Sequence, residues 1–394
     1  MDRLMEAGNR RTLRLLVTGG GTGGHTYPAL TTVAALRDHA AARGLDLDVL
    51  WVGTAAGLEA RVAAEHGIPF RAITAGKLRR SPNPRELATN LADMFRIPVG
   101  VFQAFGIAAR YRPDVVLSTG GYVCVPLGVA SRVLGRPLVM HEQITSLGLA
   151  NRILSRFARR IALTHPSSIE HLPAGVRDRA VVTGNPVRPH LLRGNVDAGR
   201  RHFGLSADLP LVYVTGGAQG SRQINTMVEA ILPELLSRAQ VIHQCGPGWI
   251  AQLTRTAAGL PVGLRDRYHP VPYVGAELAD VLAAADVVVS RSGAGTVAEL
   301  TAVGKPSVLI PLVPSAADEQ RQNARYLAEA GAASALLENG PTADRLLAEL
   351  DALLRDPRAR AAMAGAAGAL GRVDAADSLA LVLLEEARTD DKTG

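Results

Sequence analysis

The same strand-and-turn unit occurs twice in this chain. Val17-Thr18-Gly19-Gly20 follows an apolar run that begins at Leu13, and Val214-Thr215-Gly216-Gly217 repeats the pattern in the second half. Further short apolar runs alternate with helical segments, at 49–52, 70–74, 115–118, 138–140, 161–164 and 181–183, and then at 241–243, 272–274, 287–290, 308–310 and 333–337. This alternation is typical of parallel strands joined by helical crossovers. We therefore predict an α/β chain with two Rossmann-like, doubly wound parallel sheets in tandem.

The chain has 394 residues, more than one ordinary core holds, so two domains are expected. A stretch with little periodicity and three prolines, Pro186, Pro189 and Pro210, separates the two halves. We expect a flexible leader at 1–12, a first domain at 13–188, a linker at 189–209, a second domain at 210–377, and a C-terminal helix and tail at 378–394 that the sequence assigns to neither half. The first helix is expected to start at Pro28 and to stop at Gly44.

Composition narrows the classes of partner. The 43 basic and 36 acidic residues give a net charge of +7, which favours nucleic acid, a phosphorylated substrate or an anionic membrane surface. The two cysteines, Cys124 and Cys245, form no CxxC pair, which disfavours a disulfide framework or a structural zinc site and favours a reducing cytoplasm. No signal peptide is expected at the N-terminus, and no apolar run reaches the ~18 residues of a spanning helix.

The segment 286–300 is predicted to be a strand, a turn of small residues and a helix. The turn residues Ser292, Gly293, Ala294, Gly295 and Thr296 leave the first backbone N–H groups of the helix open to an anion. Glu299, about one turn later, can accept hydrogen bonds from ribose hydroxyls. Phosphate site and ribose acceptor together suggest a nucleotide, and an ordinary turn that binds nothing is the alternative.

A rival interpretation comes from Gly19-x-Gly21-x-x-Gly24, which matches the dinucleotide-binding fingerprint. That fingerprint needs an acidic residue at the end of the second strand, but the strands that follow the two glycine loops end in Gly53-Thr54 and in Gln244. A nicotinamide-dependent enzyme is therefore disfavoured. Further glycine turns at 118–122 and 215–221 suggest a phosphorylated donor and a phosphorylated acceptor.

Six sequence blocks and a seventh segment then match a known family in order. The blocks are GGGTGGHTYPAL, STGGYVCVP, HEQITSLGLANRIL, GNPVR, TGGAQGSRQIN and SRSGAGTVAEL, followed by DEQRQNA, over roughly residues 13–333. This combination resembles the MurG family of GT-B glycosyltransferases. The resemblance implies two Rossmann-like domains facing across a cleft, and inverting transfer of N-acetylglucosamine from its UDP donor to lipid I, giving lipid II in peptidoglycan synthesis.

The resemblance also implies roles for individual residues. The catalytic residues would be His25, as general base, and Glu142. The acceptor would be bound by Gly24, Tyr122, His141, Gln143 and Ile144. The donor would be bound by Thr22, Gly23, Arg188, Gly217, Gln219, Gly220, Tyr273, Val274, Ser292, Gly293, Ala294, Gly295, Thr296, Glu299, Glu319, Gln320 and Asn323. The alternative for His25 is a structural histidine bonded to a loop carbonyl. No metal ion and no other cofactor is expected, because a helix N-terminus and an arginine can stabilise the departing diphosphate.

Two positions depart from the family pattern. Ile144 stands where the family usually has asparagine, and Ala218 where serine is common. A lost side-chain partner can shift specificity strongly, so a related glycosyltransferase of a natural-product pathway, with another donor sugar or acceptor, stays open. A UDP-sugar epimerase of the same fold is the alternative from another class.

Basic and apolar residues gather between 77 and 107. The basic ones are Lys77, Arg79, Arg80, Arg85 and Arg96, and the apolar ones include Leu78, Leu91, Met94, Phe95, Ile97, Val99, Val101, Phe102, Phe105 and Ile107. Pro98 and Gly100 predict an interrupted helix here. The resemblance implies peripheral docking on the cytoplasmic face of the cell membrane, where anionic lipid attracts arginine and acyl chains accept Phe and Ile. The alternative is that these residues cover the first domain's own sheet. Expected partners are thus a UDP-sugar, a lipid-diphosphate acceptor and an anionic membrane surface, and not nucleic acid.

Overall fold

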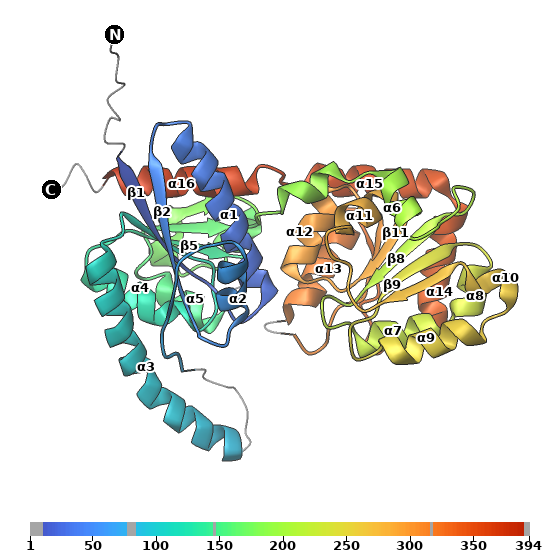
Figure 1. The fold of residues 1–394 in the computed structure, drawn as a ribbon, viewed down its shortest axis with the longest axis horizontal. Coiled ribbons are helices and arrows are strands. Elements are labelled where there is room, and N and C mark those ends of the chain that lie inside the picture. The colour runs from blue at the N-terminus through green and yellow to red at the C-terminus, as the bar shows by residue number, and fades with distance from the viewer. Residues whose placement is uncertain (1–10, 77–83, 145–146, 316–317, 390–394) are drawn as a thin grey trace, which may run out of the picture. The chain divides into compact units, whose positions relative to one another are not determined.

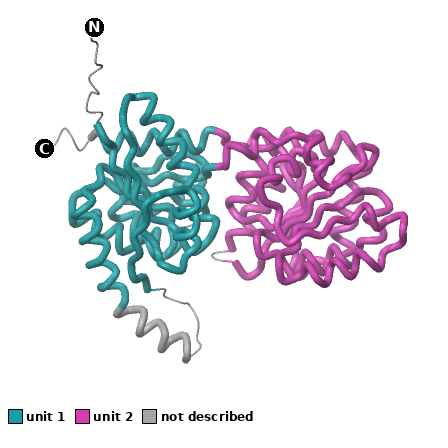
Figure 2. The backbone as a smooth tube through the Cα atoms, in the orientation of Figure 1, with its two compact units in different colours: residues 1–186, 374–394 teal, residues 187–373 magenta. Residues whose placement is uncertain are grey.

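The computed structural model describes residues 11–76, 84–144, 147–315 and 318–389. The chain forms two compact units (Figure 2). Unit 1 comprises residues 1–186 and 374–394, and unit 2 comprises residues 187–373. Among the described residues, no helix is both long enough and apolar enough to cross a membrane.

Unit 1 is built on a seven-stranded parallel sheet with the order β3-β2-β1-β4-β5-β6-β7. Its strands are β1 Thr12–Thr18, β2 Asp46–Gly53, β3 Phe70–Ala72, β4 Val115–Ser118, β5 Leu138–Glu142, β6 Arg160–Leu163 and β7 Ala180–Val182. Its helices are α1 Gly23–Ala41, α2 Leu58–Glu65, α3 Pro84–Tyr111, α4 Cys124–Val133, α5 Leu149–Leu154 and α16 Ala375–Thr389, with the 3₁₀ helices η1 Pro166–Ile169 and η2 Ala174–Arg179 (Figure 1). Apolar clusters lie on both faces of the sheet, which explains why successive residues of its strands, such as Leu15, Leu16 and Val17, are apolar.

Unit 2 is built on a six-stranded parallel sheet with the order β10-β9-β8-β11-β12-β13. Its strands are β8 Leu211–Thr215, β9 Gln240–Gln244, β10 Tyr268–Val271, β11 Val287–Ser290, β12 Ser307–Leu309 and β13 Ser334–Ala335. Its helices are α6 Val196–His202, α7 Arg222–Ala230, α8 Leu232–Leu236, α9 Ile250–Gly259, α10 Val262–Arg265, α11 Leu278–Ala284, α12 Ala294–Ala302, α13 Glu319–Glu329, α14 Ala343–Arg355 and α15 Pro357–Leu370, with the 3₁₀ helix η3 Pro189–Arg193. The predicted α/β fold with two parallel sheets is confirmed.

Three predicted elements differ in the structure. The first helix starts at Gly23 and contains Pro28. A proline inside a helix removes one backbone N–H donor, and the buried residues around Pro28 hold the helix in place despite this loss. The helix α3 also runs through Pro98 without a break. The strand expected at 272–274 lies earlier, at Tyr268–Val271, and tolerates Pro270 because β10 is an edge strand.

Two domain boundaries also differ from the expected ones. The segment 189–209 is part of unit 2 and holds η3 and α6. Asn195 caps α6, and Gly194 and Gly199 let this segment approach the backbone of α11 closely, so it packs in place and is not a free linker. The last helix, α16, belongs to unit 1, where Leu379 and Leu383 join the apolar cluster beneath α1. The expected leader and tail fall largely outside the described residues, at 1–10 and 390–394.

Candidate functional site

In unit 2, the loops that carry most predicted donor residues follow the carboxyl ends of the strands. The strand order reverses between β8 and β11, which are neighbours in register, with Ser290 beside Thr215. Ligands of open α/β sheets bind at such a reversal point. The turns 216–221 and 291–294 start there and lead into α7 and α12, which Figure 1 shows around the same sheet.

The turn after β11 is open at the start of α12. Gly293 is the N-cap and offers no side-chain hydrogen bond, and open space lies beside Gly293 and Gly295. Three residues of α13 hold this turn and its surroundings: Ala294 N donates to Glu319 Oε1 at 3.3 Å, Ser292 Oγ to the Gln320 carbonyl at 2.6 Å, and Asn323 Nδ2 to the Ser292 carbonyl at 2.9 Å. The structure thus brings together the predicted residues from Ser292 to Thr296 with Glu319, Gln320 and Asn323. The polar groups of the last three are used at least in part to shape the turn.

Arg188 and Glu299 form an ion pair. Arg188 Nε and Nη2 donate to Glu299 Oε1 at 3.1 and 2.9 Å. Burial raises the pKa of the Glu299 carboxyl, and the Arg188 guanidinium opposes that rise. Within the described chain, Glu299 Oε2 accepts no hydrogen bond, so this oxygen can accept one from a ligand hydroxyl. Arg188, predicted to bind the donor, and Glu299, predicted to bind its ribose, therefore contact each other.

Gln244 connects two of the predicted loops, a role that the sequence did not reveal. Its Nε2 donates to Thr215 Oγ1 and to the Gly217 carbonyl, both at 3.0 Å, and its Oε1 accepts from Val274 N at 2.9 Å. The sequence could have indicated this role, because Gln244 ends β9, the position where a dinucleotide-binding domain carries the acidic residue that binds ribose. Gly217, Ala218 and Gln219 form an exposed tip, and Tyr273 is exposed beside the buried Val274.

Arg291 is a second residue that the sequence analysis missed. Its Nη2 donates to Ser221 Oγ at 3.2 Å, and Ser221 caps α7. Burial lowers the pKa of this guanidinium, and no carboxylate pairs with it in the described part of the chain. Arg291 therefore adds a positive charge beside the N-terminus of α7, which favours an anion. The signal was a lone arginine in a turn of small residues.

In unit 1, hydrogen bonds fix the tautomer of His25. His25 Nδ1 lies 2.8 Å from the Thr119 carbonyl oxygen and 3.0 Å from Gln143 Oε1. A carbonyl oxygen only accepts, so Nδ1 carries the proton and Nε2 of the neutral ring keeps its lone pair. Burial lowers the pKa of His25, although these two hydrogen bonds oppose the shift. The ring is thus neutral near pH 7 and can accept a proton at Nε2.

His141 and Gln143, which were predicted to bind the acceptor, form hydrogen bonds within unit 1. Both side chains are buried. His141 Nε2 donates to the Gly184 carbonyl at 2.9 Å, and Gln143 Nε2 donates to the Thr119 carbonyl at 2.6 Å and to His141 Nδ1 at 3.1 Å. Burial lowers the pKa of His141 to about 4, so its Nδ1 stays an acceptor. These bonds turn Gln143 Oε1 toward His25, so the two residues orient the histidine.

Glu142 is enclosed beneath the loop that follows β5. Its Oε2 accepts from Asn151 Nδ2 at 2.8 Å and its Oε1 from Ile144 N at 3.2 Å. Burial raises the pKa of Glu142 to about 7. Of the other predicted residues of unit 1, Thr22, Gly23 and Gly24 lie at the start of α1, just before His25, and Tyr122 is half-buried beside Gly21. Ile144 is partly exposed.

Replacing Glu142 with glutamine should flatten the pH dependence of unfolding. A carboxyl whose pKa is raised from 4.5 to about 7 stabilises the fold below pH 4.5, and this contribution is lost as the pH rises through 7. Wild-type protein should lose up to about 3 kcal/mol across that window and the variant much less. Urea unfolding at about pH 5 and about pH 8 measures this. Exposed Glu170→Gln is the control, and equal slopes for Glu142→Gln and wild type would contradict the prediction.

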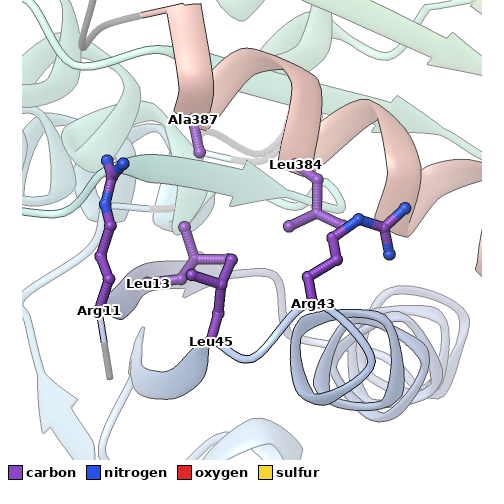
Figure 3. A pocket seen from close by; sticks show the side chains of 6 residues that line it. All are labelled: Arg11, Leu13, Arg43, Leu45, Leu384 and Ala387. Carbon is purple, nitrogen blue, oxygen red and sulfur yellow. The ribbon is translucent and has the colours of Figure 1, made fainter. Parts of the chain in front are cut away.

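A cavity of about 140 Å³ lies at the opposite edge of the unit 1 sheet. Arg11, Leu13, Arg43, Leu45, Leu384 and Ala387 line it, at the start of β1, the loop before β2 and the end of α16 (Figure 3). This edge carries the amino ends of the strands, so the cavity is separate from the His25 loops. Among the described residues, no group of three or more His, Cys, Asp or Glu side chains is placed to hold a metal ion.

Comparison with known proteins decides the family. The glycosyltransferase family 28 N-terminal domain matches residues 15–163, and the glycosyltransferase family 28 C-terminal domain matches residues 211–379. The chain belongs to glycosyltransferase family 28. The two family 28 domains contain His25 and Glu299, respectively.

Relatives match this family 28 chain over nearly its whole length. A protein of Desulforudis audaxviator is 39% identical over 371 residues, covering 93% of this chain and 96% of the relative. One of Moorella thermoacetica is 38% identical over 378 residues, covering 95% and 99%. Both are named UDP-N-acetylglucosamine–N-acetylmuramyl-(pentapeptide) pyrophosphoryl-undecaprenol N-acetylglucosamine transferase. The predicted membership of the MurG family is thereby confirmed.

Solved structures agree with this assignment. The crystal structure of Acinetobacter baumannii MurG is 26% identical, with a TM-score of 0.73 and coverage of 95% of this chain and 99% of that one. A putative UDP-N-acetylglucosamine 2-epimerase from Listeria monocytogenes is 18% identical, with a TM-score of 0.68 and coverage of 96% and 97%. At that identity the epimerase shares the fold with the family 28 chain and supports no common activity.

Proposed function

We propose that this protein transfers N-acetylglucosamine from UDP-N-acetylglucosamine to lipid I, forming lipid II in peptidoglycan synthesis. Near-full-length relatives at 38–39% identity bear the name of this transferase. The structural observation that carries the proposal is the tautomer of His25, whose Nε2 lone pair is available to a substrate hydroxyl. A UDP-sugar donor and a lipid-diphosphate acceptor are the substrates.

Unit 2 binds the donor in this proposal. The diphosphate lies against the starts of α7 and α12, where open space lies beside Gly217, Gly293 and Gly295, with Arg291 as an additional cation. Gly220, also in the loop before α7, packs closely on the Cys245 carbonyl. Glu299 accepts from the ribose through Oε2, and its partner Arg188 lies beside it. Tyr273 and Val274 bind the uracil, and Glu319, Gln320 and Asn323 bind the sugar.

Unit 1 supplies the base. His25 Nε2 takes the proton of the acceptor hydroxyl, the hydroxyl oxygen bonds to the anomeric carbon with inversion, and the C–O bond to the diphosphate breaks with its electron pair leaving on UDP. The partial positive charge at the helix starts and the Arg291 guanidinium together stabilise the departing diphosphate. The proposed chemistry therefore uses no metal ion or other cofactor. Gly24 and Tyr122 bind the acceptor in this proposal, and Thr22 and Gly23 bind the donor.

A second candidate is a related glycosyltransferase with another donor sugar or acceptor. Ile144 favours it, because a partly exposed isoleucine stands at the edge of the acceptor loop where a side-chain amide would bond a sugar hydroxyl. Ala218, on the exposed tip after β8, likewise offers no hydroxyl to the donor.

Incubation with radiolabelled UDP-N-acetylglucosamine and a short-chain lipid I analogue tests the proposal. We expect a labelled lipid product and one UDP released for each sugar transferred. UDP-glucose and UDP-N-acetylgalactosamine in parallel reactions measure donor selectivity. Turnover with another acceptor or donor only would support the second candidate. Epimerised UDP-sugar without any acceptor would instead support an epimerase.

We further propose that unit 1 docks on an anionic membrane at the cytoplasmic face through α3. Val99, Phe102 and Phe105 are exposed on α3, whereas Ala104 and Ala108 face the apolar cluster of unit 1. Arg96, on the same helix, is exposed and can contact lipid headgroups. Lys77, Leu78, Arg79 and Arg80 lie outside the described residues, as do the side chains of Arg85, Leu91, Met94 and Phe95.

Phe102→Asp should weaken binding to vesicles of anionic phospholipid by about 10-fold or more, because the substitution replaces a ring that inserts among the acyl chains with a charge that lipid phosphates repel. The matched control is Val133→Asp: Val133 is 68% exposed at the end of α4, and Phe102 is 77% exposed. Vesicle co-sedimentation at low and high salt measures the effect. Equal binding of Phe102→Asp and Val133→Asp would contradict docking through α3.

A further inference from the structure

A carboxylate lies buried beneath the first glycine loop of unit 1. Glu59, in the first turn of α2, is fully buried. Its Oε2 accepts from Gly21 N at 3.1 Å, and its Oε1 accepts from Thr54 N at 2.9 Å and from Thr54 Oγ1 at 2.7 Å. Burial acts to raise the pKa of Glu59, but hydrogen bonds from Thr54 and Gly21 outweigh it and lower the pKa below its ordinary value. The side chain is therefore an anion at neutral pH.

Three glycines make room for this carboxylate. A Cβ at Gly20 would lie 2.3 Å from Glu59 Cδ, one at Gly57 2.2 Å from Oε1, and one at Gly53 2.5 Å from Cγ. Gly20 lies in the loop after β1, Gly57 is the N-cap of α2, and Gly53 is the last residue of β2. Within the dinucleotide-like motif, Gly21 thus donates its N–H to this carboxylate, and Gly20 leaves room for it.

The corresponding loop of unit 2 has the opposite electrostatics. There Gly217 N is bonded to the neutral Thr215 hydroxyl, the end of β9 carries neutral Gln244, and the charged neighbour is Arg291. A glycine loop at a helix start is a general anion site. In unit 2 that position suits a phosphate, whereas in unit 1 Glu59 already supplies the negative charge.

The loop above Glu59 also supports the histidine. His25 N donates to the Thr22 carbonyl at 3.2 Å, and Gly20 N donates to the Gly120 carbonyl at 3.4 Å. A Cβ at Gly121 would lie 2.6 Å from the Gly20 carbonyl, so this loop packs tightly on the one whose Thr119 carbonyl accepts from His25. The loop that binds Glu59 through Gly21 N is therefore in direct contact with the loop that binds the ring of His25.

We propose that Glu59 is a positioning residue that occupies the anion site of the first glycine loop in place of a nucleotide phosphate and thereby holds His25 for proton transfer. The inference rests on the proposed function. Glu59 touches no substrate. It makes unit 1 an acceptor domain although its sequence carries a dinucleotide-like motif.

Glu59→Gln and Glu59→Ala test this role, with exposed Glu65→Gln on the same helix as the matched control. Glutamine can accept at one oxygen only, so either Gly21 or Thr54 loses its partner. We expect kcat to fall about 10- to 100-fold, with the UDP Kd from calorimetry within about twofold of wild type. Formate should restore part of kcat in Glu59→Ala by entering the vacated space, and equal sodium chloride should not.

Wild-type kcat in Glu59→Gln, a UDP Kd weakened as much as kcat, or no effect of formate would each overturn the proposal. Hydrogen–deuterium exchange gives a readout independent of transfer. Peptides over 15–30 should exchange faster in Glu59→Gln, while peptides over 212–225 stay unchanged. If wild-type protein makes no lipid product, the proposed function fails, and this exchange pattern alone decides whether Glu59 holds the loop.

Discussion

Replacing His25 with alanine should lower kcat for N-acetylglucosamine transfer by about 10²–10⁴-fold and leave the UDP Kd nearly unchanged. The substitution removes the Nε2 lone pair that the Thr119 carbonyl and Gln143 Oε1 keep available by binding Nδ1. The nucleotide contacts proposed above lie in unit 2, so UDP affinity is expected to survive. Initial rates with the lipid I analogue and calorimetry with UDP measure the two quantities.

The pH dependence of the same reaction tests the state of the ring. Since burial lowers the pKa of His25 below 6.5, kcat/KM for the acceptor should fall only when the pH drops below that value. Gln143→Glu places a carboxylate beside Nδ1 and should move this acid limb to higher pH. Exposed His66→Ala is the control for loss of a histidine. A His25→Ala enzyme with near-normal kcat would remove His25 from the role of base.

Glu299→Ala should raise the UDP Kd by about 10- to 100-fold. The carboxylate supplies the free Oε2 acceptor for the ribose and is the partner of Arg188, and a hydrogen bond to a charged group contributes about 1.5–3 kcal/mol. Calorimetry with UDP and with 2′,3′-dideoxy-UDP separates these two contributions. Wild-type protein should prefer UDP, and Glu299→Ala should bind both ligands alike.

Exposed Glu329→Ala, at the end of α13, controls for loss of charge in unit 2. Should Glu299→Ala still discriminate between the two nucleotides as wild type does, the ribose is bound elsewhere. A weaker but equal Kd for both nucleotides in the variant would confirm the assignment of Glu299 to the ribose.

Local sequence patterns predicted most elements of this fold, because its buried parallel strands contain short apolar runs and several of them lead into small residues. The turn 292–296 and its helix could be placed from Asp286–Leu300 alone. Prolines misled the prediction at Pro28 and Pro98, where the helices continue; at Pro28, buried neighbours on α1 hold a helix that has lost one donor. The segment 189–209 lacked periodicity, yet it folds because Gly194 and Gly199 meet a distant helix closely.

Contacts between residues far apart in sequence could not be predicted from such patterns. Gln143 meets His25 across 118 positions, Arg188 meets Glu299 across 111, and Glu59 meets Gly21 across 38. Periodicity reports which face of an element is buried and says nothing of its partner. Thus the sequence pointed to His25 and Glu299, whereas the roles of Gln143, Gln244, Arg291 and Glu59 needed the structure.

The return of α16 to unit 1 has a consequence for biosynthesis. The ribosome finishes residues 187–373, a contiguous segment with its own core, before it releases the helix that carries Leu379 and Leu383. Until then the nascent chain exposes the apolar surface of α1 around Leu36, which chaperones and proteases can bind. A premature stop codon shortly after position 373 would therefore spare the carboxyl-terminal sheet and leave the amino-terminal one uncovered.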